Sequence, residues 1–312
     1  MNTLVGIAAL ESPEQGSVVT VGTFDGLHLG HRGLVTRTID AARELGALSV
    51  VLTWDRHPAA TLRPDKLPPL LSSAGRKVEL IDASGVDLLA LLPFDSDLAQ
   101  QSPEDFVKAV LVEGLGARMV LVGHDWRFGH RAAGDVALLS SLGTNLGFEV
   151  RGVDLQTIAG EPVTSSRVRK AILGGDLETA RALLGRPFDL DGLVVRGAGR
   201  GRDLGYPTAN LEVDPALVRP PRGVYAGLAR VGETTTPAAI NVGVNPTFGG
   251  DPDASPVTVE PYLLDFDADL YGQILRLEFH KRLRDELRFD SVPDLVAQMA
   301  KDVEATRALL AP

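Results

Sequence analysis

The stretch SVVTVGTFDGLHLGHRG, residues 17–33, decides how the N-terminal half of the chain folds. It opens with a short, apolar, β-branched run, which predicts a buried strand. In the turn that follows, Gly22 and Gly26 let the backbone approach a ligand closely. A helix that begins near Gly30 then directs unsatisfied amides and the positive end of its dipole at the turn. The stretch therefore predicts an anion site at the carboxyl end of a first parallel strand.

Two histidines stand three residues apart at the mouth of this predicted site. His28 and His31 span the expected helix start, so both rings can face one phosphate group. A histidine there can donate a hydrogen bond to a developing oxyanion without being a permanent charge. Two other interpretations stay open: a metal site, although no third ligand is close in the sequence, or polar residues that only begin a helix. The turn is not the dinucleotide fingerprint, because G-x-G-x-x-G is absent.

The rest of the first half alternates short apolar runs with helical patterns. Strands are predicted at 18–22, 49–54, 86–92, 118–123 and 148–153. Helices are predicted at 31–45, 102–111, 165–173 and 177–184. This alternation predicts an α/β fold, a Rossmann-like parallel sheet with helices on both faces.

After about residue 184 the pattern changes to short strands. They are predicted at 190–196, 223–230, 238–242, 257–265 and 273–279, and we expect the last two to form a hairpin. A helical pattern from Ser291 closes the chain, with Leu295, Met299, Val303 and Thr306 on one face. These features predict a small β-barrel with a terminal helix. We place the boundary near Gly185, which gives domains of residues 1–185 and 186–312.

Composition narrows the classes of function. A net charge of −10 is unfavourable for a nucleic-acid binder, which normally has a basic surface patch. Any phosphate site must therefore be built locally, from backbone amides and a few basic side chains. The count of 0 cysteines excludes disulfides, thiolate catalysis and cysteine-ligated metals. No signal-peptide pattern and no membrane-length apolar run is present. We therefore expect a cytoplasmic protein with no nucleic-acid, membrane or protein partner.

Several motifs carry a resemblance to a known family. GTFDGLHLGH (22–31) resembles the nucleotidyltransferase signature with its H-x-G-H core. LVGHDWRFGHRAAGD (121–135) and TSSRVRKAI (164–172) resemble segments of bacterial FAD synthetases. Four further segments resemble the riboflavin kinase module: GRGRDLGYPTANL (199–211), GVYAG (223–227), NVGVNPTF (241–248) and VEPYLLDFDADLYG (259–272). Their order and spacing are similar to those of the bifunctional bacterial riboflavin kinase/FAD synthetases over essentially the whole chain.

For the N-terminal domain the resemblance implies an FMN adenylyltransferase, in which FMN attacks ATP and pyrophosphate leaves. It assigns His28 and His31 to the triphosphate and Arg169 to the leaving pyrophosphate. Further nucleotide contacts are expected at Gly22, Phe24, Asp25, Gly26, Ser165, Ser166 and Arg167. The resemblance places Asp125, Trp126 and Phe128 at the flavin. From the residues alone, both aromatic rings also suit a core, and 164–169 suits a capped, solvent-facing helix.

For the C-terminal domain the resemblance implies an ATP-dependent riboflavin kinase. Gly199, Gly201 and Gly205 are expected to line phosphate groups with their backbone amides. The segment is not a Walker A loop, because no Gly-Lys-Ser/Thr follows. Thr208 and Asn210 match the family's Pro-Thr-x-Asn pair and are expected to hold Mg²⁺ with ATP. Glu260 occupies the position of the general base. Flavin contacts are expected at Arg284, Glu286 and Phe289. The alternatives are a turn without a ligand, an outward strand position for Glu260 and a solvated charged turn near the end of the barrel.

The leading hypothesis is one enzyme with two active sites, which binds ATP, riboflavin, FMN and FAD. A second hypothesis is a monofunctional enzyme whose other domain only binds flavin, as a sensor or reservoir. A third is a pyridine- or pantetheine-type nucleotidyltransferase with an unrelated barrel. The Pro-Thr-Ala-Asn and Val-Glu-x-x-Leu-Leu-Asp motifs argue against the third.

Overall fold

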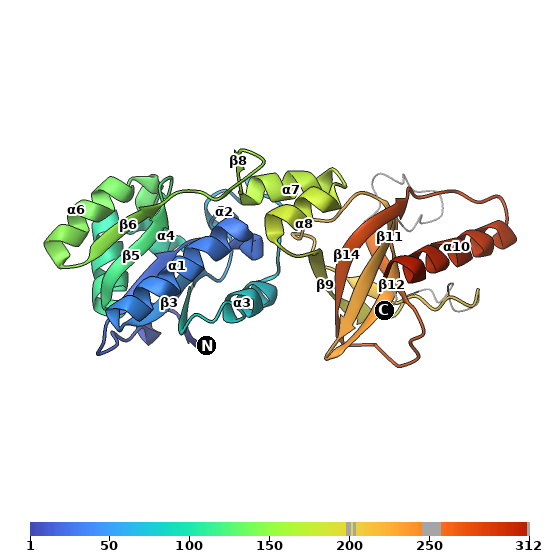
Figure 1. Cartoon of the computed structure of the whole chain (residues 1–312), viewed down its shortest axis with the longest axis horizontal. Coiled ribbons are helices and arrows are strands. Elements are labelled where there is room, and N and C mark those ends of the chain that lie inside the picture. The colour runs from blue at the N-terminus through green and yellow to red at the C-terminus, as the bar shows by residue number, and fades with distance from the viewer. Residues whose placement is uncertain (198–200, 202–203, 245–256, 311–312) are drawn as a thin grey trace. The chain divides into compact units, whose positions relative to one another are not determined.

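A parallel sheet forms the centre of the first of two units in the computed structural model (Figure 1). The structure describes residues 1–197, 201, 204–244 and 257–310. The first unit comprises residues 1–70 and 74–165, and the second comprises 71–73 and 166–312. The sheet strands are β1 (Asn2–Val5), β2 (Ser17–Val21), β3 (Leu48–Trp54), β4 (Leu88–Leu92), β5 (Ala117–Gly123) and β6 (Glu149–Val153). All neighbouring pairs are parallel, which confirms the predicted fold class.

Helices cover both faces of this sheet because its strands are apolar on both sides. Successive side chains of a strand point to opposite faces. Val51 packs on the side of α1 (Leu29–Leu45) and α3 (Ala74–Asp82). Val50 and Leu52 pack on the other side, against α5 (Pro103–Phe106), the wider helical turns of η4 (Val107–Gly114) and α6 (Val136–Leu146). The remaining short elements are η1 (Ile7–Ala9), η2 (Asp25–Leu27), α2 (Pro58–Leu62), η3 (Pro64–Lys66), α4 (Ser96–Gln100), η5 (His130–Ala132), β7 (Thr157–Ile158) and β8 (Glu161–Pro162).

The strand order locates the ligand-binding edge of the sheet. The order is β1-β4-β3-β2-β5-β6, so the chain moves outward from β2 and then returns to the other side of β2 at β5. Open α/β sheets bind ligands at such a switch point, outside the carboxyl ends of the strands. The glycine-rich turn after β2 and the segment after β5 therefore meet at one edge.

A closed antiparallel barrel forms the second unit, as the strand pattern predicted. Its strands are β9 (Phe188–Val195), β10 (Asn210–Glu212), β11 (Gly223–Val231), β12 (Thr234–Val244), β13 (Val257–Leu263) and β14 (Ile274–Arg284). Leu275, Leu277 and Phe279 of β14 face its core and are at most 2% exposed. The helices are α7 (Ser165–Leu173), α8 (Leu177–Leu184) and α10 (Val292–Leu310). Helix α8 packs on β9 and β14, and α10 packs on β11 and β12.

One local prediction about the barrel is wrong. The segments 257–265 and 273–279 do not form a hairpin, because the barrel order is β10-β13-β12-β11-β14-β9 and β13 lies between β10 and β12. Turn residues between two strands predict a chain reversal, but they do not determine which strands pair. Pro261 of β13 lies opposite Ile240 of β12, and its carbonyl accepts from the Ala209 amide at 2.9 Å. Because β10 is only 3 residues long, it does not require an N–H from Pro261.

Candidate active sites

A cavity of about 350 Å³ lies at the switch point of the first unit. Gly22 and Thr23 line it after β2, and Gly123 and Asp125 line it at the end of β5. The remaining lining includes Phe24, His28, Gly30, His31, Trp126, Arg127, Asp154, Thr164 and Ser165. The structure therefore brings residues from three separated sequence motifs to one cavity. Asp25 and Gly26 lie beside it in η2, where both are buried.

His28 caps the N-terminus of α1 and has a defined ring orientation. Its Nδ1 accepts the backbone N–H of His31 at 3.3 Å, so in the neutral ring Nε2 carries the proton. The rings of His28 and His31 stack with centroids 3.6 Å apart, and Phe24 packs edge-on against His31. These contacts fix both imidazoles over the first turn of the helix, where the amides and dipole favour an anion.

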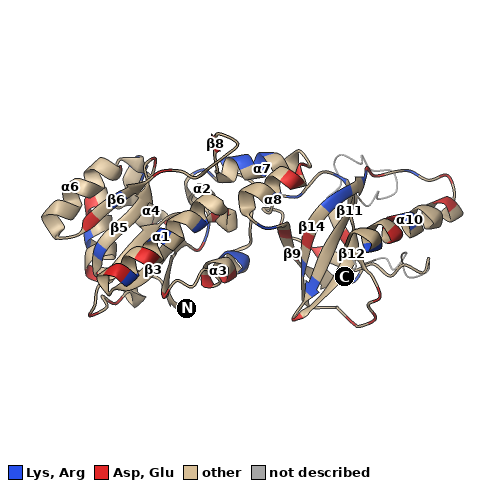
Figure 2. Ribbon diagram, viewed as in Figure 1, with Lys and Arg blue, Asp and Glu red and all other residues tan. Residues whose placement is uncertain are grey.

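The hydroxyl-rich segment before α7 contacts the glycine-rich turn directly. The Ser165 hydroxyl donates to the Asp25 carbonyl at 3.1 Å, which joins two motifs that are 140 residues apart. Ser166, Arg167 and Arg169 lie on α7 and belong to the second unit. Figure 2 shows acidic and basic residues interspersed over both units, with a run of basic residues along α7.

A second, larger cavity of about 760 Å³ adjoins the first. The two share Gly22, Thr23, Trp126 and Arg127 in their linings. Its walls are rich in aromatic rings, from Trp54, Phe94, Phe106, Trp126 and Phe128. The rings of Trp126 and Phe128 stack with centroids 4.5 Å apart. Phe128 is 7% exposed and belongs to the core, and it also lines this cavity, while its predicted contact with the flavin stays a prediction.

Lys77 is a buried cation beside this site that the sequence did not reveal. It is 6% exposed, and its Nζ donates to the Trp54 carbonyl at 2.6 Å, at the end of β3. Burial lowers the pKa of Lys77, while the charges of Asp25 and Asp55 act to raise it. A lysine in an amphipathic helix usually faces solvent, so only the packing of α3 identifies this one.

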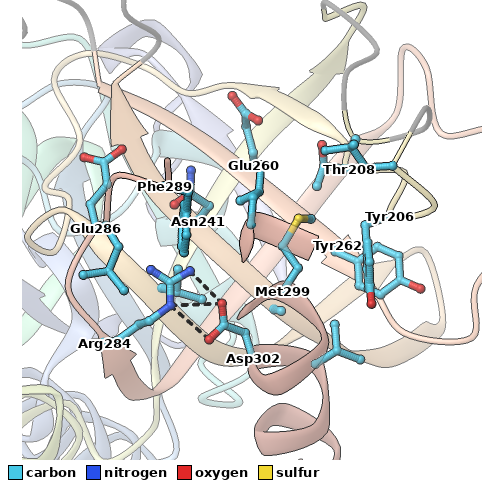
Figure 3. Close-up of a pocket in the computed structure, with 17 residues that line it drawn as sticks. Tyr206, Thr208, Asn241, Glu260, Tyr262, Arg284, Glu286, Phe289, Met299 and Asp302 are labelled. Atoms are coloured by element: carbon cyan, nitrogen blue, oxygen red, sulfur yellow. Dashed lines mark hydrogen bonds and ion pairs between the residues drawn. The ribbon is translucent and has the colours of Figure 1, made fainter. Parts of the chain in front are cut away.

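The barrel encloses a separate cavity of about 390 Å³ (Figure 3). Its lining contains the predicted residues Gly201, Thr208, Glu260, Arg284, Glu286 and Phe289. The lining also contains residues that the sequence did not single out, namely Tyr206, Asn241, Tyr262, Met299 and Asp302. Leu295, Met299 and Val303 of α10 form an apolar wall on one side.

Two described glycines of the barrel, Gly201 and Gly197, lie close to Thr208 and Asn210. A Cβ atom on Gly201 would lie 2.4 Å from the Tyr206 carbonyl oxygen and 3.1 Å from the Thr208 hydroxyl. A Cβ atom on Gly197 would lie 2.1 Å from Asn210 Nδ2. Only glycine permits this approach at both places. Gly205 has a positive φ of 83°. The predicted residue Gly199 lies outside the described residues.

An ion pair fixes α10 beside the barrel cavity. The Arg284 guanidinium donates to both carboxylate oxygens of Asp302, at 3.0 Å from Nε and 2.7 Å from Nη2. Their side chains are 18% and 8% exposed. The Arg284 guanidinium also lies 5.9 Å from the centroid of the Phe289 ring. Arg284 thus holds a wall of the cavity in place (Figure 3).

These features define a two-part transferase with a nucleotidyltransferase-like sheet and a kinase-like barrel. The family model of FAD synthetase matches residues 10–167, and that of riboflavin kinase matches residues 184–310. A bifunctional riboflavin kinase/FMN adenylyltransferase of Pseudomonas fluorescens is 38% identical over 100% of this chain and 99% of its own. The corresponding protein of Escherichia coli is 34% identical over 97% of this chain and 96% of its own. The chain belongs to this bifunctional family.

A solved structure shares the fold over nearly the whole chain. It was described as a macrolide-efflux protein from Streptococcus pneumoniae, with a TM-score of 0.86 and 32% identity over 98% of this chain and 99% of that one. The activity in that description is stated for that protein alone. Within the described residues of this chain, we find no helix with the length and apolarity needed to cross a membrane.

Proposed function

We propose that this chain phosphorylates riboflavin to FMN with its second unit and adenylylates FMN to FAD with its first, using ATP for both. One observation carries the proposal: each motif set lines a cavity of its own. His28, His31 and Ser165 line one cavity in the first unit, and Thr208 and Glu260 line another in the barrel. The division into domains of residues 1–185 and 186–312 remains part of this proposal.

Adenylyl transfer requires alignment and charge stabilisation rather than a protein nucleophile. A phosphate oxygen of FMN forms a bond to the α-phosphorus of ATP, while the bond from that phosphorus to the pyrophosphate oxygen breaks. We assign the Nε2–H of His28, the ring of His31 and the first amides of α1 to the phosphate oxygens. The assignment of Ser166, Arg167 and Arg169 to the nucleotide and its pyrophosphate stays a prediction from the sequence.

The aromatic cavity is our proposed site for the flavin ring of FMN. Its volume of about 760 Å³ and its aromatic walls suit a flat tricyclic ring. Trp126 lines both cavities, so it would contact the flavin near the point where the phosphate meets ATP. Asp125 lines only the smaller cavity, which favours a contact with the nucleotide or the ribityl chain over one with the ring.

Phosphoryl transfer in the barrel requires a base for the attacking hydroxyl. Glu260 lines the cavity from the middle of β13, and we propose that it takes the proton of the ribityl 5′-hydroxyl. The hydroxyl oxygen then bonds to the γ-phosphorus of ATP, as the bond from that phosphorus to the β-phosphate oxygen breaks. The apolar wall of α10 would support the flavin ring.

Thr208, which lines the barrel cavity, and Asn210, which is not among its lining residues, fit a hard divalent cation such as Mg²⁺. Thr208 offers a hydroxyl oxygen beside Gly201, and Asn210 offers an amide oxygen beside Gly197. Within the described part of the chain, no group of three or more His, Asp or Glu residues is arranged to hold a metal. The ion would therefore rely on substrate phosphates for most of its ligands. When bound, it neutralises negative charge on those phosphates.

Product analysis of two variants tests the proposal. With riboflavin, ATP and Mg²⁺, His31→Ala should form FMN but no FAD. Glu260→Ala should lose FMN formation by about 10²–10⁴-fold, yet form FAD from supplied FMN. Glu233→Ala, at an exposed turn of the barrel, is the matched control and should retain both activities. Chromatography of the flavins distinguishes all outcomes.

The same experiment decides against the alternatives. If Glu260→Ala leaves all turnover intact and the wild type makes no FMN from riboflavin, the barrel only binds flavin. If FMN accumulates in the wild type without FAD, the assignment of the first unit is wrong.

A further inference from the structure

Asn241 lies directly beside the proposed base in the barrel cavity. Asn241 of β12 pairs with Glu260 of β13 in the antiparallel register, and both residues line the cavity. Side chains of directly opposed residues share one face of a sheet, with Cβ atoms about 4.5–5.5 Å apart. The Asn241 amide is therefore a near neighbour of the Glu260 side chain.

Glu286 approaches the same amide from the other side. A Cβ atom on Gly243 would lie 3.1 Å from Asn241 Nδ2 and 2.6 Å from Glu286 Oε1. Both polar groups thus reach the space above Gly243, which has no side chain to separate them. In Figure 3 the Asn241 amide lies between the Glu286 and Glu260 carboxylates. The three residues form a polar row: carboxylate, amide, carboxylate.

The chemistry of this row matches a chain of neighbouring hydroxyls. An ionised carboxylate only accepts hydrogen bonds, whereas an amide both donates and accepts. Each hydroxyl also donates one hydrogen bond and accepts others. A linear polyol can therefore donate to Glu286, exchange hydrogen bonds with Asn241 and present its terminal hydroxyl to Glu260. The apolar wall from Leu295, Met299 and Val303 suits an aromatic ring attached to the other end of that chain.

We propose that Asn241 and Glu286 bind inner hydroxyls of the substrate's polyol chain and so set which hydroxyl reaches Glu260. This inference rests on the proposed kinase function of the barrel and deepens it. The ligand class is a flat aromatic ring that carries an acyclic polyol. Asn241 and Glu286 act as specificity determinants, because a polar group left without its partner penalises a substrate that lacks the matching hydroxyl.

A cycle that combines enzyme variants with substrate analogues tests this role. The substrates are riboflavin and analogues in which one inner hydroxyl of the chain is replaced by hydrogen, with the terminal hydroxyl kept. For at least one analogue, wild-type kcat/KM should fall by about 10–100-fold. Asn241→Ala should show a similar loss with riboflavin but little further loss with that analogue, because the interaction is already absent.

Controls separate this role from a structural one. Thr235→Ala, at an exposed position of the same strand, should behave like the wild type with every substrate. Asn241→Ser keeps a small hydrogen-bonding group; it should retain part of the discrimination, and it carries the same test if Asn241→Ala does not fold. If the losses from variant and analogue multiply for every analogue, the inference is overturned while the kinase function stands. If the wild type forms no FMN, the proposed function itself fails.

Discussion

At the scale of single residues, the adenylyltransferase cavity depends on how closely backbone and rings approach one another. Gly30 is the clearest case. A Cβ atom at this position would lie 3.1 Å from the Val163 carbonyl oxygen and 3.2 Å from two atoms of the His28 ring. Gly30 in the H-x-G-H core is therefore required because it leaves room for the His28 ring that caps α1. The backbone conformation of Gly30 is the less important reason.

We expect Gly30→Ala to lower FAD formation by about 10–100-fold, because small displacements of aligned groups are costly in a transfer reaction. Riboflavin kinase activity of the same protein should not change. Gly75→Ala is the matched control, since Gly75 is exposed in α3 and a Cβ there meets nothing within 4 Å. Steady-state rates of both half-reactions measure the effect. Normal FAD formation by Gly30→Ala would show that the His28 ring position is unimportant.

The sequence predicts a site residue when that residue stands in a short motif whose local structure its neighbours determine. His28, His31 and Glu260 stand in short motifs whose turn or strand is set by their neighbours, so their cavities could be anticipated. Lys77 and Asn241 could not, because a polar residue in a helix or strand pattern is indistinguishable from one that faces solvent. Their positions come from helix packing and strand register, which depend on distant parts of the chain.

At the scale of elements, a partly buried ion pair between Arg284 and Asp302 links α10 to the barrel. We expect Asp302→Ala to lower the free energy of unfolding by about 3 kcal/mol, because Arg284 is left without its carboxylate. KM for riboflavin should also rise, as α10 provides the apolar wall. Chemical denaturation and kinase kinetics measure both effects.

The matched control for this prediction is Arg307→Ala on the same helix. Arg307 pairs with Asp265, and their side chains are 43% and 70% exposed. An exposed pair contributes about 0–1 kcal/mol, so this variant should be nearly neutral. Equal losses in the two variants would contradict the assigned role of the Arg284–Asp302 pair.

Helix α8 gives a prediction about pH. Asp176 caps the helix, and its carboxylate accepts the Thr179 amide at 2.9 Å, which lowers the pKa of Asp176 below its ordinary value. The cap therefore stabilises the protein fully above the ordinary pKa of an aspartate, and the charged contribution is lost as pH falls through the lowered pKa. Asp176→Ala should cost about 1 kcal/mol at pH 7.

Urea unfolding at several pH values measures this effect. The difference in stability between the wild type and Asp176→Ala should shrink as the pH is lowered below about 4. Asp176→Asn keeps a capping oxygen without titrating, so it serves as the control. A difference that stays constant with pH would mean that the charge of Asp176 does not contribute to the cap.

At the scale of the whole molecule, pattern and periodicity predicted both architectures, and pairing was the weak point. The parallel sheet follows from strand–helix alternation, because each helix returns the chain to the same end of the sheet. In the barrel, which strands lie next to each other depends on how all six strands together close the barrel. That is why β13 and β14, adjacent in sequence, are separated by β12 and β11 on one side and by β10 and β9 on the other.

The separation of the cavities leads to a prediction for the complete reaction. Among the residues that the structure describes, those that line the two cavities of the first unit all belong to that unit, and those that line the barrel cavity all belong to the second. Each of these cavities is therefore formed within one unit, and dissolved FMN is enough to connect the two half-reactions. A mixture of His31→Ala and Glu260→Ala proteins should convert riboflavin to FAD, although neither variant does so alone. The rate should rise with the concentration of either protein, and FMN should accumulate before FAD appears. Accumulation of FMN without FAD in the mixture would mean that FMN made by one molecule does not reach the adenylyltransferase of another.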